Sequence, residues 1–440
     1  MPTCLIAGGG LAGLACAAAL ADTGFSVDLF EARPFLGGRA ASYSLHTGGE
    51  TVEIDNCQHI LLRCCVNLLD FYRRLGVEDK IRFYDAIVFL EPGGRRSVLR
   101  AGPWPEPFHF TGSLARLRFL GWRDKAALVR ATGAVGWERR RRRDLDRITF
   151  LDWLREKRQT RRAIERFWEP VIVSALNEAP GRVAARYGLQ VIWLGFLARR
   201  DNYHLGVPAV SLGRLYHPDL WRSRPRVRLH LGATVERFVF DGGCVAGAVV
   251  SGEQKQADYY VSAVDFDRAR ELLPELELDA AGWEHVPITG IHLWFDRRVT
   301  DLPHAALLGR TIQWFFDHGE GRYLQLVVSA SRSLLPMSRD AIVELAVREL
   351  AEFLPAVREA KLERSHVVKE VRATVSPAPG HEARRPGSHT PWRNLFLAGD
   401  WTRSGWPSTM EGAVRSGYLA AEAVTNRAGR LRRFVLPERE

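Results

Sequence analysis

The sequence predicts an α/β protein in which a Rossmann-type dinucleotide-binding domain carries a second, α+β domain. Two stretches indicate this class. A glycine-rich turn joins a short apolar strand to an Ala-rich helix at the start of the chain, and an apolar strand is followed by Gly399 and Asp400 near its end. The 440 residues suffice for two or three domains and a large core. Because both stretches suit one domain, we expect that domain to be discontinuous.

The start of the chain has the order strand, turn, helix, strand. Gly8, Gly10 and Gly13 fit the pattern G-x-G-x-x-G, and Glu31 ends the second strand. The predicted elements are a strand at 4–7, a helix at 11–21 and a strand at 26–30. Gly8 permits the tight turn, Gly10 lets a pyrophosphate approach the backbone, and Gly13 lets the helix pack on the strand. The helix N-terminus attracts phosphates, and Glu31 can accept hydrogen bonds from ribose hydroxyls.

The next residues identify the dinucleotide. From Glu31 to Arg39 the chain reads E-x-R-x-x-x-G-G-R, with Arg33, Gly38 and Arg39 at the fixed positions. This segment resembles the FAD-binding segment of the flavin amine oxidase and phytoene desaturase superfamily. The resemblance implies that FAD is the cofactor and that Arg39 lies along its phosphates.

The end of the chain resembles the C-terminal FAD motif of the same superfamily. Gly399 and Asp400 precede Met410-Glu411-Gly412-Ala413, where a helix begins that Thr409 can cap. The resemblance implies that Asp400 contacts the ribityl–phosphate region and that the helix N-terminus, at Met410, faces the N1–C2 edge of the flavin ring. In the middle of the chain, the backbone of Val235 is expected at the adenine.

The other residues are expected to form the substrate domain. Residues 65–205 show mostly helical periodicity, and 271–390 contain alternating runs typical of strands. Thr149 and Asp152 predict a capping box that opens a helix towards Trp168. The FAD domain is then assigned to residues 1–64, 206–270 and 391–426, followed by a tail at 427–440.

Two further stretches resemble a narrower branch, the squalene-associated desaturases known as hydroxysqualene dehydroxylases. They are Asp55-Asn56-Cys57-Gln58-His59 and Phe167–Pro170 with Ser174–Asn177. The resemblance implies that reduced FAD delivers hydride to the allylic carbon of hydroxysqualene, which loses water and gives squalene. Asp55 and His59 are the candidate general acids, with a hydrogen bond to the flavin or to a turn as the alternative role. Members of the branch carry glycine where this chain has Cys57.

Other functions stay open. An oxidative carotenoid desaturase has the same FAD motifs and transfers hydride in the opposite direction. A flavin amine oxidase is a second alternative, and a non-enzymatic, escort-like isoprenoid-binding protein is a third. The resemblance implies a long isoprenoid lipid as substrate and upstream enzymes of squalene synthesis as partners.

The net charge of +11 is concentrated in one region. Residues 116–166 hold 17 Lys or Arg and 7 Asp or Glu. One interpretation is peripheral contact between Arg116–Arg166 and the anionic inner face of a membrane; the other is a solvated helical face. Nucleic-acid binding is not expected, because no recognition module accompanies the charge.

Cysteine usage indicates a reducing, cytoplasmic compartment. The six cysteines form no CxxC pair, and no cluster with histidine suggests a metal site. Superfamily members that attach flavin covalently use a cysteine near the C-terminal motif, and the last cysteine here is Cys244. Non-covalent FAD is therefore expected. The apolar residues 4–21 lack a preceding basic residue, so a signal peptide is not predicted.

Overall fold

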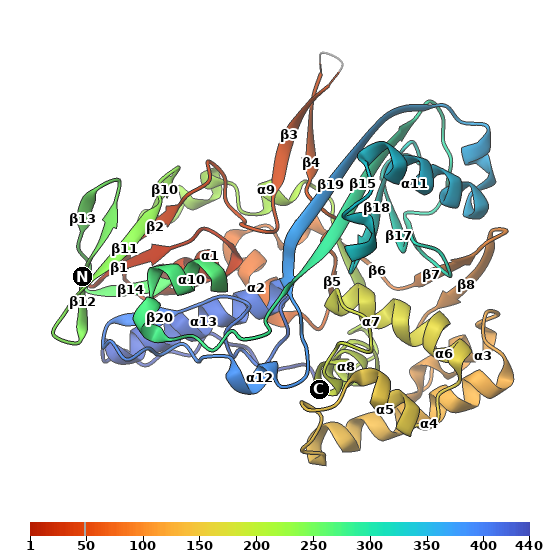
Figure 1. Ribbon diagram of the computed structural model, residues 1–440, viewed down its shortest axis with the longest axis horizontal. Helices are drawn as coiled ribbons and strands as arrows, with labels where there is room; N and C mark the ends of the chain where they lie inside the picture. Colours follow the sequence, from red (N-terminus) through yellow and green to blue (C-terminus); the bar gives the residue numbers. More distant parts are fainter. Residues whose placement is uncertain (48–49) are drawn as a thin grey trace.

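The computed structural model describes residues 1–47 and 50–440, and a five-stranded parallel sheet organises one half of it (Figure 1). In spatial order its strands are β10 (Val227–Leu231), β2 (Ser26–Glu31), β1 (Thr3–Ala7), β14 (Tyr259–Ser262) and β20 (Leu395–Leu397). All four neighbouring pairs are parallel. The strands come from the beginning, middle and end of the chain. The predicted α/β class and its discontinuous dinucleotide-binding domain are thereby confirmed.

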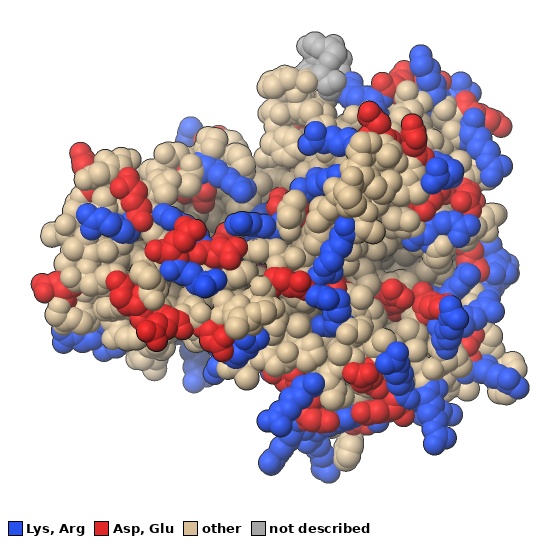
Figure 2. Space-filling view, viewed as in Figure 1, with Lys and Arg blue, Asp and Glu red and all other residues tan. Residues whose placement is uncertain are grey.

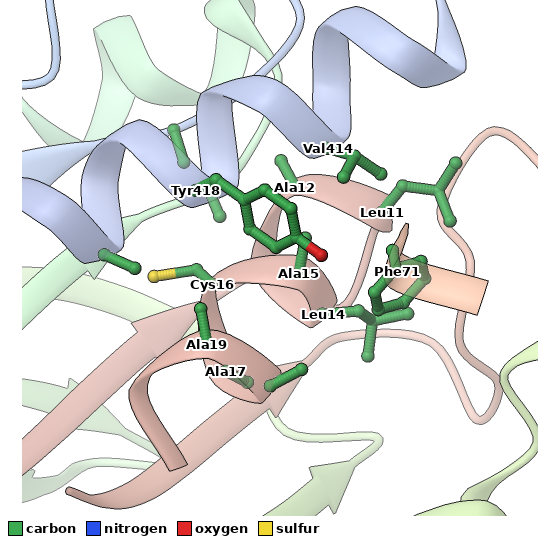
Figure 3. Close-up of a cluster of buried hydrophobic side chains, with 14 of the residues drawn as sticks. Leu11, Ala12, Leu14, Ala15, Cys16, Ala17, Ala19, Phe71, Val414 and Tyr418 are labelled. Carbon is green, nitrogen blue, oxygen red and sulfur yellow. The ribbon is translucent and has the colours of Figure 1, made fainter. Parts of the chain in front are cut away.

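Helices α1 (Leu11–Asp22) and α13 (Met410–Arg427) pack against each other beside this sheet (Figure 3). Every residue from Leu11 to Ala21 is buried, as its apolar and Ala-rich sequence requires. A Cβ at Gly417 would clash with the carbonyl oxygen of Ala12, so only glycine allows the helices to come this close. Helix α2 (Val66–Leu75) packs beside them.

A seven-stranded sheet organises the other half. In spatial order its strands are β19 (Leu362–Val375), β15 (His285–Phe295), β18 (Tyr323–Ser329), β17 (Trp314–Gly319), β16 (His304–Leu307), β7 (Ile87–Glu91) and β8 (Arg95–Leu99). The long strands β15 and β19 run from the centre of the molecule into this sheet (Figure 1). Helix α11 (Arg339–Phe353) covers one face, where its Ile342 and Leu350 join a core with Ile291 and Leu293.

The other face of this sheet meets a group of helices. They are α3 (Thr111–Arg116), α4 (Trp122–Arg141), α5 (Phe150–Glu156), α6 (Arg161–Ala163), α7 (Glu169–Leu176) and α8 (Ala185–Ile192). The stretch 65–205, expected to be helical, also contains β6 (Ile81–Tyr84), β7 and β8. Ile87, Phe89 and Leu99 of these strands are buried against the helices. Strands of four or five residues give too short an alternation to stand out in sequence.

The capping box at Thr149 is present, but its helix is shorter than expected. The Thr149 side chain accepts a hydrogen bond from the Asp152 amide, and α5 ends at Glu156. Arg158 then adopts a left-handed conformation with φ +52°, and the chain re-enters a helix at Arg161. The turn at Arg158 separates α5 from the segment that carries Trp168.

Smaller elements complete the fold. Strands β3 (Ser42–Thr47) and β4 (Glu50–Asp55) form a two-stranded sheet. Two three-stranded sheets have the orders β5 (Leu61–Leu62), β9 (Leu205–Pro208), β6 and β11 (Val235–Asp241), β12 (Cys244–Val250), β13 (Glu253–Lys255). The remaining helices are α9 (Leu212–Leu215), α10 (Phe266–Leu272) and α12 (His381–Arg384). Among the described residues, no helix has the length and apolar character needed to cross a membrane.

The close approach of α1 and α13 can be tested by adding one methyl group. Gly417→Ala should lower the free energy of unfolding by about 1–3 kcal/mol, because the new Cβ overpacks against the Ala12 carbonyl. The matched control is Gly133→Ala in α4, where a Cβ would meet nothing within 4 Å. It should raise stability by up to about 1 kcal/mol through helix propensity. Urea unfolding measures both, and equal effects would contradict the packing argument.

Candidate active site

A cavity of about 390 Å³ lies between the two sheets. The chain segments that follow β1, β2, β14 and β20 all line it, so it sits at the carboxyl ends of the parallel strands. Open α/β sheets bind their ligands at this edge. The seven-stranded sheet supplies the opposite wall through residues of β15, β17, β18 and β19: Ile288, Trp314, Phe316, Val327 and Glu370.

The glycine-rich turn has the conformation that its sequence predicts. Gly8 has φ +111°, and a Cβ there would lie 2.8 Å from the Ala263 carbonyl oxygen. A Cβ at Gly13 would clash with the Gly8 carbonyl, which explains why α1 can begin directly behind the strand. Gly10 is the N-cap of α1, and neither a side-chain cap nor an acidic residue occupies that first turn. The first N–H groups of α1 are therefore available to a phosphate. Gly8 and Gly10 line the cavity, while Gly13 lies behind it.

Glu31 links the end of β2 to the glycine-rich turn. Its Oε2 accepts a hydrogen bond from the Gly9 amide at 2.7 Å, and its Oε1 accepts one from the Arg33 amide at 2.8 Å. These bonds orient the carboxylate, which lines the cavity and retains further lone pairs for hydroxyl donors. Arg33 also lines the cavity and donates from Nη1 to the Gly38 carbonyl at 3.0 Å.

Arg39 and Asp400 form an ion pair that joins the two ends of the chain. Asp400 is buried, and its second carboxylate oxygen accepts a hydrogen bond from Ser408. Burial alone would raise the pKa of Asp400, but the Arg39 charge and these hydrogen bonds hold it below its ordinary value. Gly38, Arg39, Gly399 and Asp400 all line the cavity. The two sequence motifs thus meet at one site.

The N-terminus of α13 reaches the same cavity. Thr409 is its N-cap and accepts a hydrogen bond from the Gly412 amide at 3.1 Å. Thr409 and Met410 line the cavity, so the positive end of the helix is directed at its contents. The adjacent Glu411 points the other way and caps α2, accepting from the amides of Asn67 and Leu68.

Val235 lies outside the cavity lining. It is buried at the start of β11, and its carbonyl accepts a hydrogen bond from Arg268 Nη2 at 3.0 Å. Arg268 and Asp265 line the cavity instead, and sequence reasoning missed both. The sequence did contain a signal for Asp265, because this acidic residue follows a predicted strand, β14, at the carboxyl edge of the sheet. Glu370 and Trp314 also line the cavity, but they belong to antiparallel strands that carry no local signal of a site.

The candidate acids Asp55 and His59 have different positions. Asp55 lies outside the cavity lining, where its Oδ1 accepts hydrogen bonds from Ser42 Oγ at 2.6 Å and from the Leu212 amide at 2.9 Å. Burial raises the pKa of Asp55 to about 6, despite these two bonds. These bonds connect β4 to β3 and α9, and the proton transfer expected of Asp55 from sequence stays a prediction.

His59 lines the cavity, and its Nε2 lies 3.2 Å from Asn56 Oδ1. Burial lowers the pKa of His59 to about 4, so the imidazole is neutral near pH 7. Asn56 Nδ2 donates to the Arg39 carbonyl at 2.8 Å, which connects this polar group to the cofactor motif. With its Nε2–H facing Asn56, the neutral imidazole keeps Nδ1 as an acceptor for a substrate or cofactor hydroxyl.

Cys57 also lines the cavity, between these polar residues. Its backbone is outside the left-handed region, so a cysteine is accommodated there without backbone strain. Next to it, Gly290 of β15 lies close to the backbone of Asn56: a Cβ at Gly290 would lie 2.9 Å from the Asn56 carbonyl oxygen. Burial raises the pKa of the Cys57 thiol to about 12, which keeps it protonated.

A second cavity, of about 160 Å³, adjoins the first. The two share the lining residues Ile60, Ser174, Ala175, Leu176, Trp314, Thr409 and Met410. Beyond this junction the walls are almost wholly apolar, with Leu62, Phe89, Val171, Leu194 and Phe196 among them. The Ser174 hydroxyl is already engaged, because it donates to the Pro170 carbonyl at 2.6 Å and accepts from Trp314 Nε1 at 2.7 Å. The second cavity therefore suits a hydrocarbon.

The first cavity suits a dinucleotide. The glycine-rich turn, the N-termini of two helices and an oriented carboxylate at Glu31 meet in it. The family model described as "Flavin containing amine oxidoreductase" matches residues 11–425. The chain belongs to this family.

Two relatives and one solved structure illustrate the likeness. The chain is 26% identical over 491 residues to a zeta-carotene desaturase from Synechocystis sp., covering 98% of this chain and 99% of the relative. It is 27% identical over 472 residues to a 15-cis-phytoene desaturase from Synechococcus elongatus, covering 97% of each. An oxidoreductase from Methanosarcina mazei has the same fold, with a TM-score of 0.70 at 18% identity and coverage of 95% and 99%.

FAD is the cofactor of this flavin-containing oxidoreductase. Within the cavity, Gly8, Gly10 and the N-terminus of α1 would hold the pyrophosphate, and Glu31 would hold a ribose. Arg39 and Asp400 stand where the two FAD motifs meet, and the N-terminus of α13 would face the flavin. The positive end of that helix would stabilise negative charge on a reduced ring.

The Arg39–Asp400 pair should control FAD retention. Arg39→Ala removes a positive charge from the cavity and leaves the buried Asp400 without its counter-ion. We expect FAD affinity to fall on the order of tenfold to a hundredfold, as for a broken buried pair. Flavin absorbance per protein and titration of the apoprotein measure this. Arg228→Ala is the control, because it removes an exposed pair with Asp28. Equal affinities for the two variants would contradict the role of Arg39.

Proposed function

We propose that this protein is an FAD-dependent oxidoreductase that transfers hydride between the flavin and a long isoprenoid lipid. The observation that carries this proposal is the apolar second cavity, which adjoins the cofactor cavity and shares seven lining residues with it. A hydrocarbon chain gains stability from burial along such walls. The two relatives, a zeta-carotene desaturase and a 15-cis-phytoene desaturase, support a substrate of this class.

The reaction proposed first is reduction of hydroxysqualene to squalene. The resemblance of residues 55–59 and 167–177 to the dehydroxylase branch supports it. The allylic C–O bond breaks, a C–H bond forms at the same carbon, and the departing hydroxide takes a proton and leaves as water. FAD, when bound, supplies the hydride for this reduction or accepts one in the reverse sense.

Oxidative desaturation of a carotenoid precursor is the second candidate, and the two desaturase relatives favour it. In that reaction a C–H bond gives up hydride, the neighbouring carbon gives up a proton, and a double bond forms. The two reactions need different side chains. Reduction needs a side chain that gives a proton to the leaving hydroxide, and desaturation needs one that accepts a proton from the substrate.

The polar end of the cavity can serve either requirement. His59 is neutral near pH 7 and its Nε2–H faces Asn56 Oδ1, so its Nδ1 is left to accept a hydrogen bond from a hydroxyl or to accept a proton. Glu370 and Gln58 line the same end of the cavity. The apolar walls of the second cavity exclude water from the bound chain and fix which of its carbons comes to the junction.

A paired anaerobic assay tests the proposal. Holoprotein with chemically reduced FAD and detergent-dispersed hydroxysqualene should yield squalene, detected by mass spectrometry. Holoprotein with oxidised FAD and phytoene or zeta-carotene is the second arm, followed by polyene absorbance. Squalene that requires both protein and reduced flavin supports the first candidate. New polyene without squalene moves the assignment to desaturation, and no product in either arm rejects an isoprenoid substrate.

A variant at the junction checks that the substrate uses the second cavity. Ala175 lines both cavities, so Ala175→Phe should lower turnover roughly tenfold or more while FAD stays bound. Ala281→Phe adds the same ring at an exposed loop position and should leave turnover unchanged. Turnover that is insensitive to Ala175→Phe would place the substrate elsewhere.

Asp55 and His59 should behave differently in the same assay. Asp55→Asn should lower the melting temperature but retain turnover per bound flavin, because Asp55 bonds Ser42 and Leu212 outside the cavity. His59→Ala should lower turnover by about tenfold to a hundredfold. Because the pKa of His59 is near 4, its protonation should not change the rate between about pH 5.5 and pH 8. A tenfold fall in rate per pH unit across that range would instead require an imidazolium as the acid.

A further inference from the structure

Exposed apolar side chains gather on one part of the surface. Among the described residues, nine large hydrophobic side chains are exposed, and five of them come from residues 104–137. These five are Trp104, Phe108, Trp122, Val129 and Trp137, with exposures of 57%, 63%, 75%, 59% and 61%. Large aromatic rings are rarely left this exposed without a partner.

Helix α4 explains the pattern, because most residues on both its inward and its outward face are apolar. Its inward face buries Ala127, Leu128, Ala131 and Val135 against the helical core. At 100° per residue, its outward residues fall within an arc of about 80°. These outward residues are Trp122, Ala126, Val129, Gly133, Trp137 and, in the last turn, Arg140, which pairs with Glu440. A helix that only faces water would carry mostly polar residues there.

Arginines border this outward arc. Arg123, Arg130 and Arg141 are exposed along one side of it. The Arg123 guanidinium lies 5.3 Å from the Trp122 ring centroid, and that of Arg141 lies 5.7 Å from the Trp137 ring centroid. We call Trp122, Arg123, Val129, Arg130, Trp137 and Arg141 the α4 surface.

The rest of the basic stretch is partly neutralised. Arg139 pairs with Glu438 and Glu440 of the C-terminal tail, and Arg142 pairs with Asp144 and Glu156. In Figure 2, Lys and Arg side chains project at the lower right, where Figure 1 places α3 to α6, with acidic side chains among them. Arg123, Arg130 and Arg141 therefore keep their charge beside the exposed tryptophans, while Arg116, Arg118, Arg143, Arg147 and Arg158 are exposed elsewhere in the stretch.

One helical layer separates the α4 surface from the apolar cavity. Gly136 of α4 packs on Trp193, where a Cβ would lie 2.6 Å from the ring. Trp193 opens the π-helical turn η4 (Trp193–Leu197), and Leu194 and Phe196 of that turn line the second cavity. Phe110, two residues after the exposed Phe108, contacts Phe196 with ring centroids 6.2 Å apart.

We propose that the α4 surface docks on an anionic phospholipid bilayer. Trp122, Val129 and Trp137 enter the headgroup boundary, and the bordering arginines pair with lipid phosphates. A second copy of this chain fits the surface less well, because a symmetric contact would place the same arginines against one another. That a membrane-dissolved substrate passes from this surface to the second cavity rests on the proposed function; the docking itself does not.

Vesicle cosedimentation tests the docking without any substrate. Full-length holoprotein is mixed with vesicles of phosphatidylcholine alone or of phosphatidylcholine with phosphatidylglycerol. We expect binding to the anionic vesicles that weakens as salt is raised. Trp122→Gln with Trp137→Gln should reduce the partition coefficient at least tenfold, and Arg123→Gln with Arg130→Gln and Arg141→Gln on the order of a hundredfold.

Matched controls keep the test specific. Val371→Gln with Leu431→Gln removes two other exposed hydrophobic residues and should leave binding unchanged. Retained flavin absorbance and circular dichroism show that the variants are folded. Equal binding of the α4 variants and the control would overturn the proposal. The native chain could instead form a concentration-dependent dimer and not bind vesicles. If the Trp122/Trp137 variant abolished that dimer, the α4 surface would be assigned to contact with a second copy of this chain. Vesicle binding without turnover would reject the proposed function and keep the docking.

Discussion

The contact between helices α1 and α13 brings the two ends of the chain to one place, and the site depends on it. Small residues make it possible, since any side chain at Gly417 would collide with the Ala12 carbonyl. With the helices in place, Asp400 reaches Arg39 and the N-terminus of α13 reaches the glycine-rich turn. Two separate helix N-termini then face one cavity, an arrangement suited to an anionic cofactor.

The cavity changes character along its length. At the carboxyl edge of the parallel sheet it is lined by charged residues, including Glu31, Arg39 and Asp400. Beyond Ser174 and Trp314 it becomes apolar, because helices α7 and α8 and strand β7 present aliphatic and aromatic side chains there. A cofactor rich in polar groups and a substrate with almost none can therefore meet at the junction, where the few polar groups, among them His59, determine orientation.

Tertiary structure also divides the basic stretch into two parts. In sequence, residues 116–166 form one positive region. In the fold, acidic residues of the C-terminal tail and of the segment after α4 neutralise Arg139 and Arg142, while Arg123 and Arg141 stack on exposed tryptophans. Charge and apolar exposure coincide on the outward face of α4, next to the helical layer that lines the second cavity.

The sequence by itself determined the α/β class, the discontinuous dinucleotide-binding domain and its FAD motifs. Those features follow from local rules: glycine where φ is positive or a backbone approaches, an acidic residue after a strand, and small residues where helices meet. Only the tertiary structure decided which polar side chains face the cavity. Asp55 and His59 are four residues apart, yet one bonds Ser42 outside the lining and the other lines it. Glu370 and Trp314 arrive from antiparallel strands, because the pairing of distant segments, which no local pattern encodes, sets what a site contains.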